Sequence, residues 1–167
     1  GEAIKSGLDY LLKNYPEFSH VAIMDADMQY NPEETLKIFN MLENNNLDFV
    51  MGERGWEGVP FRHRLGNFVW RKTFNTIFKT SFKDTNCGLM GFNRNAAEKL
   101  KDHILGGYIV DNSILIGAVK NELKMDQVHV KVSYHRKSKV TRGVRIVLGV
   151  LLYILREGLR YRFGRRR

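Results

Sequence analysis

The sequence has 167 residues, a formal net charge of +9 at pH 7, one cysteine and 43% hydrophobic residues. This length is enough for one domain with a hydrophobic core, and a single cysteine excludes an internal disulfide framework and an all-cysteine zinc site. The charge indicates an anionic partner: a nucleic acid, a phosphorylated substrate or an acidic membrane surface. Residues 1–61 are mildly acidic, and the positive charge gathers in 62–83 and 131–167.

Helices and strands alternate along the first third of the sequence. The expected elements are a helix over 2–14, a strand over 21–25, a helix over 32–44 and a strand over 47–52. Asn31 and Glu34 have the spacing of a capping box at the start of the second helix, with Pro32 at its first position. This alternation predicts an α/β domain with a parallel sheet, in which ligands bind beyond the carboxyl ends of the strands.

Two acids follow the first strand directly. Asp25 and Asp27 stand at i and i+2, which places both side chains on one face of a strand. With the amide oxygen of Gln29 they form a hard-oxygen set suited to Mg²⁺ or Mn²⁺, with waters and substrate phosphates completing the shell. Asp is also a frequent turn and capping residue, so the spacing alone leaves a structural role open. Arg54, at the end of the second strand, is expected on the same rim.

The middle of the sequence contains a basic loop and further regular elements. We expect a loop over 55–64, helices over 65–78, 95–101 and 112–122, and a half-exposed strand over 125–134. The aromatic residues of 65–78 favour a surface helix packed by its apolar side over a nucleic-acid-binding surface. Gly88 and Gly91, in a short apolar run, indicate a close backbone approach or a bulge. His129 and His135 are expected to be solvated, because no partner stands at metal-ligand spacing.

The C-terminal segment, 141–167, is expected to form a unit apart from a domain over 1–140. A long helix over 144–163 contains an apolar run, 147–155, with arginines around it. This run is much shorter than the ~20 residues that cross a bilayer. A basic helix with one apolar side is typical of a helix lying in the headgroup layer of an anionic membrane. The alternatives are packing on the domain itself or on transmembrane segments outside this sequence.

Several segments form a series that, taken together, resembles a known family. They are Gly1 to Gly7, Asp25 to Gln29 with Asn31-Pro32-Glu33, Gly52-Glu53-Arg54, Arg64 with Asn67, Asp84 to Phe92, Asp111, and Tyr134 to Lys139. Their order resembles family 2 glycosyltransferases of the GT-A fold, especially the dolichyl- and polyprenyl-phosphate mannose and glucose synthases. The resemblance implies a Rossmann-like, mostly parallel sheet with flanking helices. It also implies an N-terminally incomplete domain, because family members carry nucleotide-binding strands before the position of Gly1.

The resemblance implies a transferase that moves a hexose, mannose or glucose, from a nucleotide sugar to a polyprenyl (dolichyl) phosphate with inversion. The donor would be GDP-mannose or UDP-glucose, and Mg²⁺ or Mn²⁺ on Asp25, Asp27 and Gln29 would stabilise the leaving diphosphate. Asp111 and Asp27 are the expected catalytic residues, although Asp111 also suits a plain N-cap. The phosphate-binding candidates are Arg54, Arg64, Arg136 and Lys139, whose cationic groups bind phosphate oxygens.

The expected location is peripheral, on the cytoplasmic face of a membrane with an anionic surface. A non-catalytic, membrane-associated fragment or relative of the same family is the alternative, because the nucleotide-binding strands are missing from the sequence. Nucleic acid is not an expected partner, since the sequence has no helix-turn-helix, RNP or zinc-finger pattern.

Overall fold

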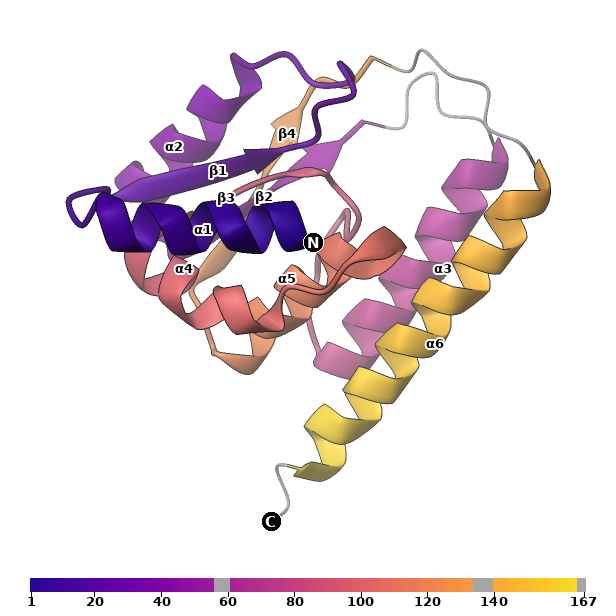
Figure 1. The fold of residues 1–167 in the computed structure, drawn as a ribbon. Coiled ribbons are helices and arrows are strands. Elements are labelled where there is room, and N and C mark those ends of the chain that lie inside the picture. The colour runs from indigo at the N-terminus through magenta and orange to yellow at the C-terminus, as the bar shows by residue number, and fades with distance from the viewer. Residues whose placement is uncertain (56–60, 134–139, 165–167) are drawn as a thin grey trace.

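The computed structural model describes residues 1–55, 61–133 and 140–164. Its α-helices are α1 (Glu2–Asn14), α2 (Glu34–Asn44), α3 (Phe61–Phe78), α4 (Arg94–Leu100), α5 (Val110–Lys120) and α6 (Val140–Gly164). Its strands are β1 (His20–Met24), β2 (Phe49–Arg54), β3 (Leu89–Asn93) and β4 (Met125–Val130), and two short 3-10 helices, η1 (Lys101–His103) and η2 (Gly107–Ile109), precede α5. The predicted helices and strands are therefore present, with ends shifted by a few residues (Figure 1).

The four described strands form one sheet in the order β1-β3-β2-β4. β2 and β4 pair in parallel, whereas β3 is antiparallel to both β1 and β2. Three of these four strands therefore point the same way, as predicted for a mostly parallel sheet, and β3 is the exception. A Cβ on Gly91 of β3 would lie 2.4 Å from Cγ2 of Ile38 in α2, so this glycine marks a close approach of the helix to the sheet.

β1 is less buried than β2. All five of its residues are only partly buried, whereas Phe49, Val50 and Met51 of β2 are fully buried. The reason is topological, because β1 lies at one edge of the described sheet and pairs there with β3 alone.

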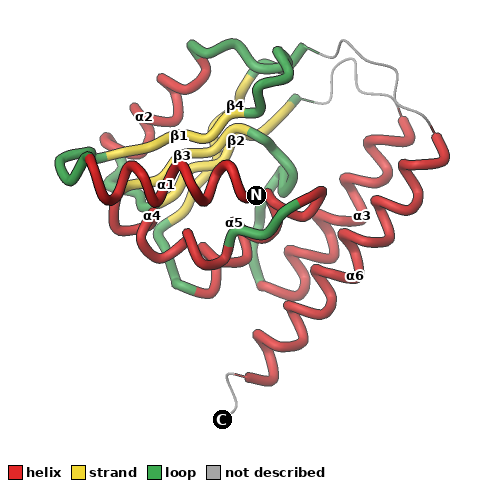
Figure 2. The backbone as a smooth tube through the Cα atoms, in the orientation of Figure 1, coloured by secondary structure: helices red, strands yellow, loops and turns green. Residues whose placement is uncertain are grey.

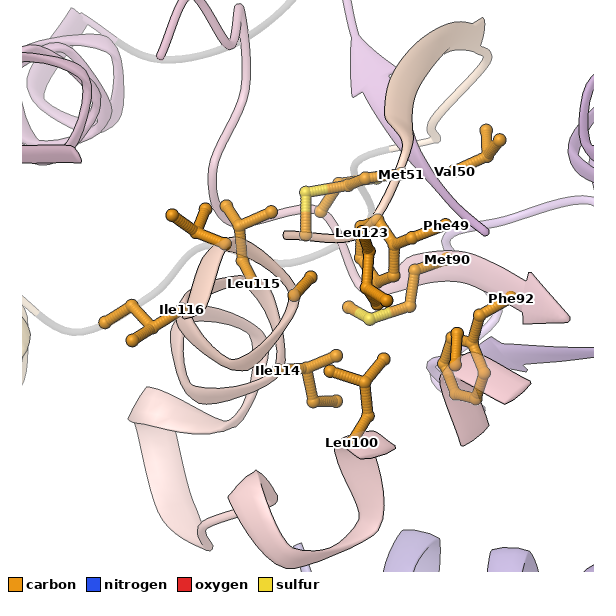
Figure 3. Close-up of a cluster of buried hydrophobic side chains, with 14 of the residues drawn as sticks. Phe49, Val50, Met51, Met90, Phe92, Leu100, Ile114, Leu115, Ile116 and Leu123 are labelled. Atoms are coloured by element: carbon orange, nitrogen blue, oxygen red, sulfur yellow. The ribbon is translucent and has the colours of Figure 1, made fainter. Parts of the chain in front are cut away.

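The two faces of the sheet are covered by different helices. On one face, Phe49 of β2 stacks against its β3 partner Phe92 with ring centroids 6.1 Å apart. These two rings lie among Met51, Met90 and the apolar residues of α4 and α5 (Figure 3). Because side chains alternate along a strand, Val50 points to the opposite face, where α2 packs against the sheet. The result is a three-layer α/β arrangement whose core lies on both faces of β2 and β3.

The start of α2 differs from the predicted capping box. The Asn31 side chain accepts a hydrogen bond from the backbone N–H of Glu33 at 3.1 Å, and the helix begins only at Glu34. The Glu34 carboxylate binds Lys37 at 2.6 Å and the backbone N–H of Lys131 at 3.2 Å. The box prediction was wrong because long-range contacts to the end of β4 compete for the Glu34 side chain.

α3 and α6 lie side by side next to the sheet-containing part and run in the same direction (Figures 1 and 2). The indole N–H of Trp70 donates to the carbonyl of Val147 at 3.0 Å, and a Cβ on Gly158 would lie 2.1 Å from Cγ2 of Ile77. Near the end of α6, Arg162 donates to the carbonyl of Ile77 at 3.0 Å. α6 is thus packed closely on α3. Within the three described ranges, no helix combines the length and apolar character needed to span a bilayer.

Candidate active site

The end of β1 places Asp25 against the segment that leads into β3. The backbone N–H of Asp25 donates to the carbonyl of Gly88 at 3.0 Å. A Cβ built on Gly88 would lie only 1.9 Å from Oδ2 of Asp25 and 2.4 Å from its Cγ. Only a glycine at position 88 therefore leaves room for this orientation of the Asp25 carboxylate.

Asp27 lies in the turn that follows Asp25, and both side chains are exposed. Its Oδ1 accepts a hydrogen bond from the backbone N–H of Gln29 at 3.1 Å, across Met28, which has a left-handed φ of 65°. The carbonyl of Gln29 accepts from the N–H of Ser133 at 2.9 Å, which ties this turn to the segment after β4. The turn is therefore held at both ends.

The two acids fit part of a divalent-cation site. The surrounding protein partly desolvates the Asp25 carboxylate and so raises its pKa, the negative charge of Asp27 raises it further, and Arg54 opposes the shift. Two carboxylates that repel one another are stabilised by a shared cation. Among the described residues, no three His, Cys, Asp or Glu side chains cluster closely enough to hold a metal ion. Mg²⁺ and Mn²⁺ sites commonly use one or two carboxylates and take their other ligands from waters and phosphates, so the pair fits that kind of site.

Arg54 is paired with Asp84, which was not among the predicted site residues. Its Nε donates to Oδ2 of Asp84 at 2.6 Å and its Nη2 donates to Oδ1 at 3.0 Å. The two side chains are largely buried, with exposed fractions of 16% and 6%. Asp84 also accepts from the backbone N–H of Asn86 at 3.0 Å. This bidentate pair joins the end of β2 to the segment before Gly88, and the role of Arg54 in phosphate binding stays a prediction.

Tyr30 and Cys87 hold the segment around Gly88 in place through buried contacts. The Tyr30 hydroxyl accepts from the backbone N–H of Gly88 at 3.1 Å and lies 3.4 Å from Sγ of Cys87. Burial, more than any neighbouring charge, raises the pKa of Cys87 to about 12. The thiol is therefore neutral at physiological pH and acts as a packing group. Neither residue was predicted to belong to the site, because their contact joins positions far apart in the chain.

Asp111 reaches the same neighbourhood from α5. It lies in the first turn of this helix, whose N-cap is Ile109, so the interpretation of Asp111 as a plain N-cap was wrong. Burial raises its pKa to about 6, and the charge of Asp25 adds to the shift while Arg54 opposes it. The charges of Asp25 and Arg54 therefore act on Asp111, although these residues come from the ends of β1 and β2 and from the start of α5.

The other predicted site residues lie on α3, in the turn after β1, or outside the described residues. Arg64 lies on α3 with an exposed side chain, and Gln29 is partly buried. Arg136 and Lys139 lie outside the described residues. The side chain of His129 is exposed, in agreement with its predicted solvation, and His135 falls outside the described ranges. The part of the site that the structure assembles is therefore Asp25 and Asp27, with Asp111 and the Arg54–Asp84 pair beside them.

The overall arrangement is that of a GT-A fold. A crystal structure of glucosyl-3-phosphoglycerate synthase from Mycobacterium tuberculosis, in complex with Mn²⁺, UDP-glucose and phosphoglyceric acid, superposes with a TM-score of 0.73 at 18% identity, over 94% of this chain and 54% of that one. The same enzyme in complex with UDP superposes with a TM-score of 0.71. The chain therefore has the mixed α/β, Rossmann-like fold of these glycosyltransferases, with a four-stranded sheet, flanking helices and a C-terminal helix.

The relatives found by sequence are 26–29% identical to this chain, and the chain covers only part of each of them. No protein-family model matches the sequence. An uncharacterised protein of Methanocaldococcus jannaschii is 29% identical over 146 residues, which cover 80% of this chain and 60% of the relative. The UDP-N-acetylglucosamine–dolichyl-phosphate N-acetylglucosaminyltransferase of Methanococcus voltae is 26% identical over 86% of this chain and 59% of its own length. A low-salt glycan biosynthesis hexosyltransferase of Haloferax volcanii is 27% identical over 70% of this chain and 29% of its own. The chain thus spans no more than about 60% of these curated relatives.

Proposed function

We propose that this chain acts in the metal-dependent, inverting transfer of a hexose, mannose or glucose, from a nucleotide sugar to a polyprenyl (dolichyl) phosphate. The observation that carries the proposal is the cluster of acids at the carboxyl end of β1. Asp25 lies against Gly88 there, Asp27 follows in the turn, and the charge of Asp25 acts on Asp111 of α5. The names of the relatives support it, because one acts on a dolichyl phosphate and another is a hexosyltransferase. The complexes of the structural neighbour contain UDP-glucose and Mn²⁺, which supports a nucleotide-sugar donor and a divalent ion.

Asp25 and Asp27, with the amide oxygen of Gln29, are the residues that would hold Mg²⁺ or Mn²⁺. Bound there, the ion supplies positive charge for the diphosphate that leaves the sugar. The Asp27–Gln29 hydrogen bond keeps the turn in place, and Gly88 leaves the space that the Asp25 carboxylate occupies. The donor, GDP-mannose or UDP-glucose, would bring its own phosphate oxygens to this rim.

In the proposed transfer, an oxygen of the acceptor phosphate forms a bond to C1 of the sugar while the bond from C1 to the donor diphosphate breaks. The nucleoside diphosphate leaves with the electron pair of that bond. The acceptor phosphate is already ionised, so the step needs orientation and charge compensation more than a base. Asp111 would orient a sugar hydroxyl or an arginine. Asp27 would contribute as one of the residues that hold the metal ion. Arg64, Arg136 and Lys139 are the candidate partners of the phosphates, with Arg54 held in place by Asp84.

We also propose that α6 attaches the chain peripherally to the anionic cytoplasmic face of a membrane. Large apolar side chains form an exposed stripe along this helix at positions three or four residues apart: Leu148, Leu152, Leu155, Leu159 and Phe163. Exposed arginines accompany the stripe at Arg145, Arg156 and Arg160. A stripe of this kind beside basic residues suits the boundary between headgroups and acyl chains. The same helix packs on α3, so the attachment surface would be rigidly joined to the domain.

Donor binding and sugar transfer test the proposal separately. Calorimetric titration of the chain with UDP-glucose or GDP-mannose should show binding that requires Mn²⁺. The double variant Asp25→Asn/Asp27→Asn should lose this binding at least tenfold. A matched control is Asp102→Asn/Asp126→Asn, which removes the same charge from two exposed acids outside the cluster, and it should bind as the wild type does. Transfer of labelled hexose to a polyprenyl phosphate would then establish the reaction.

The outcomes distinguish the enzyme from a non-catalytic membrane-associated relative. Binding to vesicles of anionic lipid without any metal-dependent binding of a nucleotide sugar would support the non-catalytic alternative. Equal donor binding by the two double variants would show that Asp25 and Asp27 do not hold the metal. In that case the proposed site would be wrong even if transfer were observed.

A further inference from the structure

Asn112 is a fully buried asparagine whose side-chain amide is only half paired. It lies in the first turn of α5, directly after Asp111. Its Nδ2 donates to Oδ1 of Asn86 at 3.2 Å. Within the three described ranges, its own Oδ1 is the only buried side-chain nitrogen or oxygen without a hydrogen-bond partner. A buried acceptor in this state costs about 1–3 kcal/mol, so an asparagine at this position calls for a functional explanation.

The bond from Asn112 fixes the orientation of the Asn86 side chain. Oδ1 of Asn86 accepts from Nδ2 of Asn112 and also, at 3.3 Å, from the hydroxyl of Thr85. Because both hydrogen bonds go to the same oxygen, the NH₂ group of Asn86 points away from these two donors. This NH₂ group makes no hydrogen bond with the described residues, and it is not buried, since the one buried unpaired atom among them belongs to Asn112. Asn86 therefore presents a neutral N–H donor to solvent in a fixed orientation.

The backbone of Asn86 joins this donor to the candidate site. Its N–H donates to Oδ1 of Asp84 at 3.0 Å, and Asp84 holds Arg54 through two hydrogen bonds from the guanidinium. Asn86 also stands two residues before Gly88, where a built Cβ would meet the Asp25 carboxylate. Two residues span at most about 7 Å, so the backbone of Asn86 lies close to Asp25. A ligand held at Asp25 would therefore have the amide of Asn86 beside it.

We propose that Nδ2 of Asn86 donates a hydrogen bond to a hydroxyl of the hexose that the nucleotide sugar carries, and that Asn112 positions this amide, an inference that rests on the proposed function. The diphosphate of the donor is the partner of the metal ion and of the cationic side chains, whereas the sugar offers neutral hydroxyls. A neutral amide N–H suits a hydroxyl oxygen, and a site that hydrogen-bonds a hydroxyl discriminates against a ligand that lacks it. Asn86 thereby contributes to recognition of the sugar and not of the nucleotide.

Three alanine substitutions separate this role from a structural one. Asn86→Ala removes the donor itself, and Asn112→Ala leaves the donor but removes the bond that orients it. Asn121→Ala is the matched control, because Asn121 is another partly buried asparagine, at the opposite end of α5 from Asp111. Its Nδ2 lies 3.1 Å from Nε2 of His103 and donates to the carbonyl of Gly117 at 2.9 Å. Urea unfolding of the three variants shows how much stability each has lost, so the control reports what destabilisation alone does to binding.

Calorimetry in the presence of Mn²⁺ compares UDP with UDP-glucose, and GDP with GDP-mannose, on the 167-residue chain. For the pair that binds, the measured quantity is the Kd of the nucleoside diphosphate divided by the Kd of the nucleotide sugar. Asn86→Ala should lower this ratio about fivefold, as expected for the loss of one hydrogen bond, and Asn112→Ala should lower it about twofold or more. The affinity for the nucleoside diphosphate alone should change less than about twofold in both variants. Asn121→Ala should match the wild type in both quantities.

Several results would overturn the inference. An unchanged ratio in Asn86→Ala, or an equal loss of affinity for the nucleoside diphosphate without its sugar, would show that Asn86 does not bind the hexose. A wild-type ratio in Asn112→Ala would show that Asn112 does not position the amide, and this variant decides the test if Asn86→Ala fails to fold. A wild type that binds neither pair of nucleotides would overturn the inference together with the proposed function.

A transfer assay separates this inference from the proposed function. If the ratio depends on Asn86 but no hexose is transferred to a polyprenyl phosphate, the sugar contact is supported and the proposed function fails. If hexose is transferred and Asn86→Ala keeps the wild-type kcat and the wild-type KM for the nucleotide sugar, the proposed function stands and Asn86 is not a sugar-binding residue.

Discussion

Replacement of Gly88 by alanine should damage the candidate site while leaving the fold nearly unchanged. The new Cβ would lie 1.9 Å from Oδ2 of Asp25, whereas an ordinary contact between carbon and oxygen is about 3.3 Å or more. The carboxylate must therefore move by about 1.4 Å. Asp25 is exposed, so it has room to rotate toward solvent, and its backbone bond to the Gly88 carbonyl is retained.

The expected magnitudes differ for stability and function. An off-rotamer side chain costs about 0.5–1.5 kcal/mol, and replacing glycine by alanine returns about 0.4–1 kcal/mol where the backbone conformation is compatible. The free energy of unfolding should consequently change by less than about 1 kcal/mol. Misplacement of a reacting or metal-binding group by about 1 Å reduces rates about 100-fold, so metal-dependent donor binding and transfer should fall steeply in Gly88→Ala.

Urea unfolding and calorimetric titration with Mn²⁺ and UDP-glucose measure the two effects. Gly52→Ala is a contrasting variant, because its Cβ would lie 2.7 Å from Sγ of Cys87 and 2.8 Å from Cγ2 of Val130, both in the core. Overpacking of this kind costs about 1–3 kcal/mol. If Gly88→Ala binds metal and donor as the wild type does, the contact between Gly88 and Asp25 does not shape the site. If it instead unfolds as readily as Gly52→Ala, the separation of function from stability is refuted.

Three further substitutions probe the surroundings of the site. Asp84→Ala leaves the guanidinium of Arg54 buried without its bidentate partner, so the free energy of unfolding by urea should fall by about 3–5 kcal/mol, and a loss below 1 kcal/mol would contradict this pairing. Asp111 has its pKa raised to about 6 from 3.8 by burial, so the folded state binds its proton more tightly and stability is lost as pH rises from about 4 to 6. By pH 7 this loss is about 3 kcal/mol, and Asp111→Asn should remove it; parallel stability–pH curves for variant and wild type would be the contrary result. Asn93→Ala removes the side chain that accepts from the N–H of Ala96 at 2.8 Å at the start of α4 and donates to Oδ1 of Asp48 at 2.8 Å; thermal unfolding should report a loss of at least about 1 kcal/mol, against no change if these two bonds are unimportant.

Local sequence patterns predicted most of the regular elements. Apolar runs bounded by turn residues located the strands that became β1 and β2, and helical periodicity located α6 within four residues of its observed start. The two acids after β1 were identified for the same reason, because the end of a strand is marked by the residues around it. These signals depend on neighbours within one or two turns of the chain, so they can be read from a single sequence.

The site itself required the tertiary structure. Arg54 and Asp84 are 30 residues apart, and the Tyr30–Cys87 contact joins positions 57 residues apart. The reversal of β3 between β1 and β2, which brings Gly88 under Asp25, also follows from strand pairing between distant segments. The sequence by itself determined which chemical groups stand at the ends of the elements. Only the order and direction of the strands decided which of those groups meet, because pairing depends on burial across the whole core and leaves no local pattern.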